Sequence, residues 1–276
     1  MDKKELYSVG EVSKICNISK KALRFYDQIG MIEPDEVNEN NYRYYSRETL
    51  TFIPIIKYYK QMGFKLSEMK EVIEGASYDV LERLFRKKID EIAEEEFELY
   101  KKMRSVRDWY DLIVEAETVL ENKNEEVNVK FMPQIDYCYL EQDFDYNFIE
   151  AIVNIEWTNY LESINSEITG PVILYFPSIP DRVSGQAKLA RVLQQTINEA
   201  DVEEKHPMRG GLYLSCYHIG THETLTETYE KMLSWAEENG YRYGEDSYER
   251  YVTDYWTTRR NDIFITEVLI PAKKKR

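Results

Sequence analysis

The pattern of apolar positions over residues 8–30 predicts two short helices joined by a tight turn. Ser8 and Glu11 have the spacing of a capping box, in which each side chain satisfies a free backbone group at the helix start. Ser19 can cap the second helix, and Gly30 suits a left-handed helix end because it has no Cβ. The apolar stripe of the first helix consists of Val9, Val12, Ile15 and Cys16. This is the pattern of a helix-turn-helix, although a helical hairpin with no role in DNA binding shares it.

Residues 41–45 alternate aromatic and basic side chains, which predicts a short strand beside the two helices. Residues 46–62 then have a helical pattern, and Pro54 should kink or restart that helix. A further short helix is expected from Ser67 to about Gly75.

Residues 79–121 contain neither glycine nor proline and predict one long helix. Its apolar residues are spaced by four and three, which is the heptad pattern of a coiled coil. Pairing between two subunits is favoured over packing within one chain, because the seam is longer than either flanking domain could cover. The seam consists of Leu99, Met103, Val106, Tyr110 and Ile113, and Leu81, Phe85, Ile89 and Ile92 continue it upstream.

Beyond residue 125 the periodicity predicts an α+β domain in which one strand-helix-strand-strand unit occurs twice. The strands of both copies are expected to form one sheet with two helices against a face. The predicted strands are 127–141, 171–176, a segment near Val202, 212–219, 248–254 and 263–270, and the predicted helices are 146–164 and 221–239. Apart from the segment near Val202, the pattern assigns no structure between residues 179 and 205.

The composition, with 43% hydrophobic and 32% charged residues, is that of a folded protein. No apolar run approaches the ~20 residues of a membrane span, and the N-terminus lacks the apolar core of a signal peptide. We therefore expect a cytoplasmic protein with no membrane partner. The three cysteines Cys16, Cys138 and Cys216 form no CxxC pair and predict neither a disulfide framework nor a zinc module, and no cofactor is expected.

The net charge of −15 is unevenly distributed along the chain. Residues 1–76 hold 12 Lys and Arg against 12 Asp and Glu, whereas residues 125–276 hold 15 against 26. Contact with a polyanion is therefore expected only at the N-terminal end, and the C-terminal half favours cations. The groups on the second helix that can reach phosphates and base edges are Ser19, Lys20, Arg24 and either Phe25 or Tyr26.

The stretch VGEVSKICNISKKALRFYDQIGMIEP, followed by NYRYYS and IKYYKQMGFKLSEMKEVI, closely resembles the winged helix-turn-helix of the MerR family of transcription regulators. The resemblance implies that the long helix pairs antiparallel with its counterpart in a homodimer on double-stranded promoter DNA. Pro54 and Phe25 depart from the family pattern. By position, the resemblance assigns DNA contacts to Lys20, Arg24, Phe25 and Tyr26 in the recognition helix, to Tyr42, Arg43 and Tyr44 in the wing, and to Lys60 and Lys65 at a second wing-like corner.

The C-terminal half resembles the GyrI-like effector-binding domains found in multidrug-sensing MerR relatives of the BmrR type. The motifs that carry the resemblance are YLSCYHIG at 213–220, WAEENGY at 235–241, YERY at 248–251 and TEVLIP at 266–271. The resemblance implies that a glutamate on the strand after the last helix points into an aromatic pocket, and Glu249 has that place.

The residues around Glu249 support the same chemistry. On an extended strand Glu249, Tyr251 and Tyr255 share a face, and a carboxylate beside aromatic rings suits a lipophilic cation. A buried Glu249 should have a raised pKa or accept hydrogen bonds from tyrosines. Ordinary packing is the alternative for each tyrosine. Further aromatic neighbours are expected from other elements, namely Tyr139, Tyr175, Tyr213, Tyr217 and Trp157.

We therefore predict a DNA-binding domain over residues 1–76, a dimerisation helix over 77–123 and an effector-binding domain over 124–276. The resemblance implies an activator that distorts the promoter spacer when its effector is bound, so that RNA polymerase can engage. The alternatives are a GyrI-like hydrolase, a drug-sequestering protein and a ligand-independent repressor. The sequence holds no GxSxG motif and no evident Ser-His or Cys-His triad, which disfavours an enzyme. No cysteine follows the long helix closely, which disfavours metal sensing.

Overall fold

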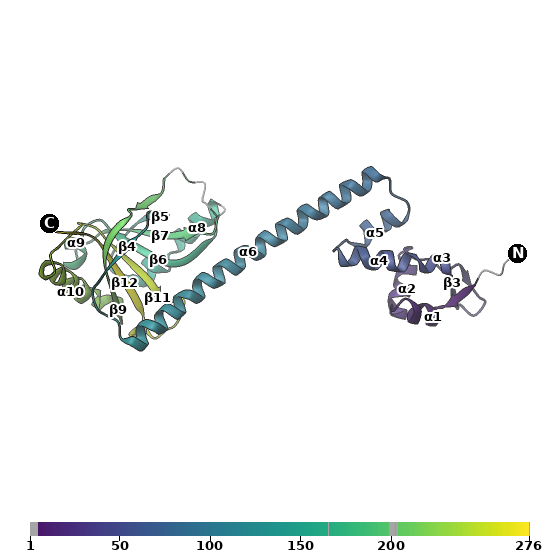
Figure 1. The fold of residues 1–276 in the computed structure, drawn as a ribbon, viewed down its shortest axis with the longest axis horizontal. Coiled ribbons are helices and arrows are strands. Elements are labelled where there is room, and N and C mark those ends of the chain that lie inside the picture. The colour runs from purple at the N-terminus through teal and green to yellow at the C-terminus, as the bar shows by residue number, and fades with distance from the viewer. Residues whose placement is uncertain (1–4, 165, 199–201, 203, 276) are drawn as a thin grey trace. The chain divides into compact units, whose positions relative to one another are not determined.

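The computed structural model describes residues 5–164, 166–198, 202 and 204–275, and the chain divides into two compact units (Figure 1). Unit 1 is Met1–Phe97 and unit 2 is Glu98–Arg276. The division falls inside the long helix α6 (Tyr78–Asn122). The bounds of α6 confirm the single helix predicted over residues 79–121. The three-domain division by residue number stays a prediction.

Unit 1 has the helices and the strand that the sequence predicts. The capping box at the start of α1 is formed, and the Ser19 hydroxyl accepts a hydrogen bond from the Ala22 amide at the start of α2. Gly30 ends α2 with a φ of 66°. The elements are β1 (Leu6–Ser8), α1 (Val9–Ile15), α2 (Lys20–Gln28), β2 (Glu36–Val37), β3 (Arg43–Ser46), α3 (Arg47–Leu50), α4 (Phe52–Gln61) and α5 (Leu66–Ile73).

Pro54 restarts the helix rather than kinking it. Helix α3 ends at Leu50, and α4 begins at Phe52, so the proline lies in the first turn of α4, where its missing N–H removes no helical hydrogen bond. The start of α5 differs slightly from the expectation at Ser67. Lys65 is the N-cap, and its amide donates a 2.7 Å hydrogen bond to the Glu68 carboxylate.

Unit 2 contains the predicted duplication. One copy is β5-α7/α8-β6-β7 and the other is β9-α10-β11-β12, all in one antiparallel sheet with the order β4-β9-β12-β11-β6-β7-β5-β8. The third strand of each copy lies between the other two, and β11 and β6 pair where the copies meet. The elements are β4 (Asn128–Met132), β5 (Ile135–Asp143), α7 (Phe148–Ile152), α8 (Ile155–Ser163), β6 (Ile168–Phe176), α9 (Ile179–Val183), β7 (Leu189–Thr196), β8 (His206–Met208), β9 (Gly211–Ile219), α10 (Leu225–Glu238), β10 (Tyr241–Tyr243), β11 (Ser247–Thr253) and β12 (Ile265–Lys274), with short 3-10 turns at His222–Thr224 and Asn261–Ile263.

Three expectations for unit 2 were wrong in detail. The predicted strand 127–141 is two strands, because Pro133 lies between β4 and β5 and cannot donate to a ladder. The predicted helix 146–164 breaks at Asn154, which caps α8 through its side chain. The strand that closes the first copy is β7, and Val202 lies in no helix or strand. Residues 199–201 and 203 beside it lie outside the described residues.

Different helices pack against the two faces of the large sheet. On the helix-covered face, residues such as Leu174, Val268 and Tyr251 pack with helices α7, α8 and α10 in the largest core cluster. On the opposite face, here called the α6 face, Val252 and Ile265 pack against Leu112, Ala116 and Val119 of α6. Successive residues of a strand point to opposite faces, so each strand contributes alternate side chains to the two environments.

The predicted seam of α6 is exposed on the single chain. Leu99, Val106 and Tyr110 keep 68%, 70% and 61% of their surface exposed, and Met103 and Ile113 are also exposed. A contiguous apolar stripe of this kind marks an interaction surface. Among the described residues, no helix combines the length and the apolar character needed to cross a membrane.

We expect Val106→Glu to weaken dimerisation at least tenfold, because two glutamates would be brought into an apolar seam. Analytical ultracentrifugation of the full chain measures the dissociation constant. Asp111→Lys is the matched control, because Asp111 is exposed on the same helix and lies outside the seam. The same dissociation constant for both variants and the unchanged chain would contradict the coiled coil.

Candidate functional site

Helix α2 presents most of the predicted recognition residues to solvent. Ser19, Lys20, Arg24 and Phe25 are exposed, and Phe25 keeps 43% of its surface. Tyr26 is different: its ring is only 5% exposed and belongs to the core of unit 1. Position 26 follows Leu23 by three residues and shares its buried side of the helix, so Phe25 is the exposed member of the pair. A DNA contact by Tyr26 stays a prediction.

The wing residues lie on and beside strand β3. Tyr42 precedes the strand and is 65% exposed, whereas Arg43 and Tyr44 are half-buried. The Arg43 Nε donates to Asp27 Oδ2 of helix α2 at 2.5 Å. Tyr45 packs in the core of unit 1. A phosphate contact by Arg43 therefore competes with an existing ion pair. Lys60 and Lys65, at the predicted second corner, are exposed.

The structure separates the eight predicted effector-binding residues onto the two faces of the sheet. Glu249, Tyr251, Tyr255 and Trp157 belong to the cluster on the helix-covered face or contact it. The other four, Tyr139, Tyr175, Tyr213 and Tyr217, lie on the α6 face. The expectation of one shared pocket is wrong. In the register of the paired strands, the side chains of these four tyrosines point to the face opposite to that of Glu249.

Glu249 is fully buried and fully paired. Its Oε1 accepts from Arg182 Nε at 2.7 Å and from the Tyr229 hydroxyl at 2.9 Å, and its Oε2 accepts from the Tyr251 hydroxyl at 2.7 Å. The expectation that tyrosines donate to a buried Glu249 is confirmed. These contacts satisfy both oxygens of a carboxylate that water cannot reach.

Arg182 occupies the position beside Glu249 that a cationic ligand would take. Its side chain is 3% exposed, and five aromatic rings lie with centroids 5.2–5.9 Å from its guanidinium carbon. The rings belong to Phe144, Tyr146, Phe148, Phe176 and Tyr229. Sequence reasoning missed this residue, because α9 is only five residues long and is too short to have a measurable periodicity.

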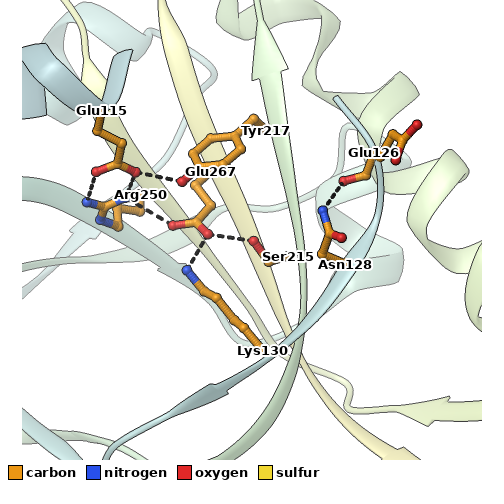
Figure 2. A network of polar contacts seen from close by, with 8 residues as sticks. All are labelled: Glu115, Glu126, Asn128, Lys130, Ser215, Tyr217, Arg250 and Glu267. Carbon is orange, nitrogen blue, oxygen red and sulfur yellow. Dashed lines mark hydrogen bonds and ion pairs between the residues drawn. The ribbon is translucent and has the colours of Figure 1, made fainter. Parts of the chain in front are cut away.

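A second polar network lies on the α6 face (Figure 2). Arg250 of β11 forms a two-pronged pair with Glu115 of α6, at 2.6 and 2.7 Å, and its Nη1 also donates to Glu267 Oε2 at 3.0 Å. Burial opposes ionisation of Glu115, but its hydrogen bonds and charge contact with Arg250 hold its pKa below the usual value. Both carboxylates are therefore tied to one guanidinium.

Glu267 of β12 is 1% exposed and accepts two further donors at its Oε1. The Ser215 hydroxyl donates at 2.5 Å, and the ammonium group of Lys130 forms an ion pair with the same oxygen. The Tyr217 hydroxyl donates to Glu115 at 2.8 Å, which joins a predicted ligand-binding tyrosine to the network. The described contacts thus place two carboxylates and two cations together.

A cavity of about 430 Å³ adjoins this network on the α6 face. This volume lies within the ~300–1,000 Å³ of typical small-molecule sites. Its polar wall is formed by Glu267, Arg250, Lys130, Glu115 and Gln195. Its apolar wall is formed by Met132, Ile135, Tyr137, Pro171, Ile173, Met208 and Leu269.

An aromatic cluster surrounds Tyr248 farther along the α6 face. The rings of Tyr175 and Tyr213 lie with centroids 5.1 and 6.2 Å from that of Tyr248, and His206 contacts Tyr175, Tyr139 and Tyr248. Burial lowers the pKa of His206 to about 4, with a smaller effect of Arg191. This histidine therefore stays neutral near pH 7 and packs as an aromatic residue.

The three histidines make no serine or cysteine pair among the hydrogen bonds of the described residues. His206 bonds Arg191 and Tyr248, and His218 bonds threonines. His222 is buried and stacks on Phe264. Among the residues that the structure describes, no group of three His, Cys, Asp or Glu side chains is arranged to hold a metal ion.

Comparison with known families matches both ends of the chain. Residues 7–76 match the family described as MerR HTH family regulatory protein, and residues 125–273 match the GyrI-like small molecule binding domain. The two matches leave the long helix between them.

Two relatives from Bacillus subtilis (strain 168) are regulators. The multidrug-efflux transporter 2 regulator is 26% identical over 99% of this chain and 98% of its own length. The multidrug-efflux transporter 1 regulator is 41% identical over 32% of this chain and 34% of its own length. Among solved structures, the cryo-EM structure of the EcmrR–DNA complex in EcmrR-RPo covers 97% of this chain and 100% of that chain, with 18% identity and a TM-score of 0.48.

We expect Arg182→Met to lower the free energy of unfolding of unit 2 by about 3–5 kcal/mol, because Glu249 would keep a buried charge without a partner. Adding Glu249→Gln to this variant should recover part of the loss. All four tryptophans, Trp109, Trp157, Trp235 and Trp256, lie in unit 2, so urea unfolding followed by their fluorescence reports this unit.

The control for this experiment is Arg260→Met, which breaks an exposed pair with Asp262. It should leave the urea midpoint nearly unchanged. Equal losses in the two variants, or no recovery in the double variant, would contradict the role of Arg182.

Proposed function

We propose that this chain, which belongs to the family of GyrI-like small-molecule binding domains and carries a MerR-type helix-turn-helix at residues 7–76, is a ligand-responsive transcription activator that works as a homodimer. The observation that carries the proposal is the order of its parts. Along the sequence, the segment that matches a helix-turn-helix precedes a helix of 45 residues, and the small-molecule domain follows it.

The proposed partners are double-stranded promoter DNA, RNA polymerase and a small lipophilic cationic or aromatic effector. The balanced charge of residues 1–76 and the exposed Lys20 and Arg24 of helix α2 support DNA contact. Two copies of helix α2 in a dimer would contact a two-fold related operator. The exposed seam of α6 supports the homodimer.

Activation requires a difference in effector affinity between two conformations. An effector that bound both equally would change nothing, however tightly it bound. We propose that the bound form distorts the promoter spacer so that the polymerase can engage, and that the free form does not.

Two features support a cationic effector. The segment 125–276 has an excess of acidic residues, and the sheet buries two carboxylates. Two relatives are named as regulators of multidrug-efflux transporters, which supports a drug-like effector. The predicted site at Glu249 would need an effector that displaces Arg182. A GyrI-like hydrolase or a drug-sequestering protein remains the second candidate, favoured only by the cavity on the α6 face.

We expect Arg43→Ala to weaken operator binding and to reduce its dependence on salt. Each Arg43–phosphate contact that is lost should lower the slope of log affinity against log salt by about one unit. Fluorescence anisotropy of labelled promoter DNA in a salt titration measures both quantities. Arg260→Ala, which removes an exposed arginine of unit 2, should change neither. The same affinity and slope in the Arg43 variant and the unchanged chain would exclude Arg43 from the interface.

A reporter assay tests the activity as a whole. Transcription from the promoter upstream of the chain's own gene should rise with lipophilic amines and stay flat with neutral aromatic compounds of the same size. DNA binding without any response to effectors would indicate a ligand-independent repressor. Release of alcohol from aromatic esters by the purified protein would favour the hydrolase.

A further inference from the structure

We infer that unit 1 binds a lipophilic organic anion, such as an aromatic sulfonate or carboxylate, in a groove between the end of helix α1 and helix α4. This groove belongs to the unit that carries the helix-turn-helix, and it takes a ligand of the opposite charge to the proposed effector. The inference goes beyond the proposed function, because anion binding in this groove requires neither the effector nor DNA.

The groove is mainly apolar and large enough for a small molecule. Its volume of about 600 Å³ lies within the ~300–1,000 Å³ of typical small-molecule sites. Two of its side chains, Ile15 and Tyr58, keep 59% and 62% of their surface exposed. Large apolar side chains that are exposed around one groove indicate a binding surface. The apolar lining consists of Tyr7, Ile15, Leu50, Pro54 and Tyr58.

The charge of the groove is positive. Among the described residues that line it, Arg47 of α3 and Lys57 of α4 are cations and none is a carboxylate. Within the part of the chain that the structure describes, neither cation forms an ion pair with Asp or Glu. The groove is therefore a locally positive site in a segment, residues 1–76, whose Lys and Arg balance its Asp and Glu.

Lys57 connects the groove to the turn between α1 and α2. Its ammonium group donates to the backbone oxygens of Cys16 and Asn17, at 2.5 and 3.2 Å. An ammonium group has three N–H donors, so one remains for an anion in the groove. Asn17 has a φ of 44°, and the turn that it makes leads directly into α2. An anion on Lys57 therefore lies beside the start of the predicted recognition helix.

The two cations and the apolar lining together select an organic anion. The planar guanidinium of Arg47 matches the paired oxygens of a carboxylate or sulfonate, and charge-assisted hydrogen bonds of this kind are the strong ones. A neutral aromatic compound would leave both cations without a partner. An inorganic phosphate, or a phosphate of DNA, has no apolar body and would leave Ile15 and Tyr58 in water.

An anion in the groove opposes DNA binding. Ser19 and Lys20, two of the predicted DNA contacts, follow Asn17 by two and three residues. Charges interact over about 8–10 Å at physiological salt, so an anion on Lys57 repels DNA phosphates near this end of α2. By linkage, operator DNA then weakens anion binding by the same factor as the anion weakens operator binding.

The test measures binding of naphthalene-2-sulfonate to the full-length protein by calorimetry. Methanesulfonate has the charge without the apolar body, and naphthylmethanol has the apolar body without the charge. Each should bind at least tenfold more weakly than naphthalene-2-sulfonate. Inorganic phosphate at the same concentration should not displace naphthalene-2-sulfonate.

Variants of the lining place the anion in this groove. Arg47→Gln and Tyr58→Ser, which change exposed side chains, should each weaken binding of naphthalene-2-sulfonate at least fivefold. Thr51→Arg adds a third cation to the lining and should tighten binding several-fold, a gain that cannot come from a folding defect. The matched control is Arg83→Gln, which removes an exposed arginine of unit 1 outside the lining and should bind as the unchanged chain does.

Three results would overturn the inference. Equal binding of methanesulfonate or phosphate would make the groove a plain phosphate contact. Unchanged binding in both Arg47→Gln and Tyr58→Ser would place the sulfonate elsewhere. Weaker binding in Thr51→Arg would exclude a site governed by positive charge.

Fluorescence anisotropy of labelled promoter DNA measures the coupling to α2. Saturating naphthalene-2-sulfonate should weaken promoter binding of the unchanged chain at least twofold, and the same concentration should have a smaller effect on Arg47→Gln. A promoter affinity that does not change when the groove is filled would overturn the coupling. The response of the reporter to amines does not enter these measurements, so this inference and the proposed function fail separately.

Discussion

A carboxylate inside a protein needs a cation or hydrogen-bond donors beside it, because removing its charge from water is costly. Unit 2 contains two buried carboxylates that meet this requirement, one on each face of its large sheet. Glu249 is neutralised by Arg182 on the helix-covered face, and Glu267 is neutralised by Lys130 and Arg250 on the α6 face. The two cations differ in exposure, since Arg182 is enclosed by aromatic rings and Lys130 is partly exposed.

The duplication of unit 2 explains why the site lies near the middle of the sheet. Each copy inserts its last strand between the other two, so β11 and β12 stand beside the junction of the copies. Arg250 and Glu267 are paired residues on those strands. The C-terminal part of α6 packs against the same face and contributes Glu115. A helix that also belongs to the DNA-binding unit thus takes part directly in the polar network beside the cavity.

Local features were predicted well because they depend on neighbouring residues. The capping box at Ser8, the cap at Ser19, the restart at Pro54 and the long helix follow from short-range geometry. The strand-helix-strand-strand duplication was also predicted, since period-two and period-3.6 patterns are local. The failures were of another kind. Pro133 and Asn154 break elements that periodicity alone would join, and the segment containing Arg182 is too short to have a period.

The sequence by itself determined the order of the parts, most of the helices and strands, and the residues on the exposed side of α2, because each depends on spacing along the chain. For a buried Glu249 it left two outcomes open, a raised pKa or hydrogen bonds from tyrosine hydroxyls, and the structure has the hydrogen bonds. Only the tertiary structure decided that Arg182 pairs with Glu249, that four predicted tyrosines lie on the other face, and that Glu115, Lys130, Arg250 and Glu267 meet beside a cavity. The reason is that these partners stand 17 to 137 positions apart in sequence, and strand pairing together with the packing of α6 and α9 on the sheet brings them together.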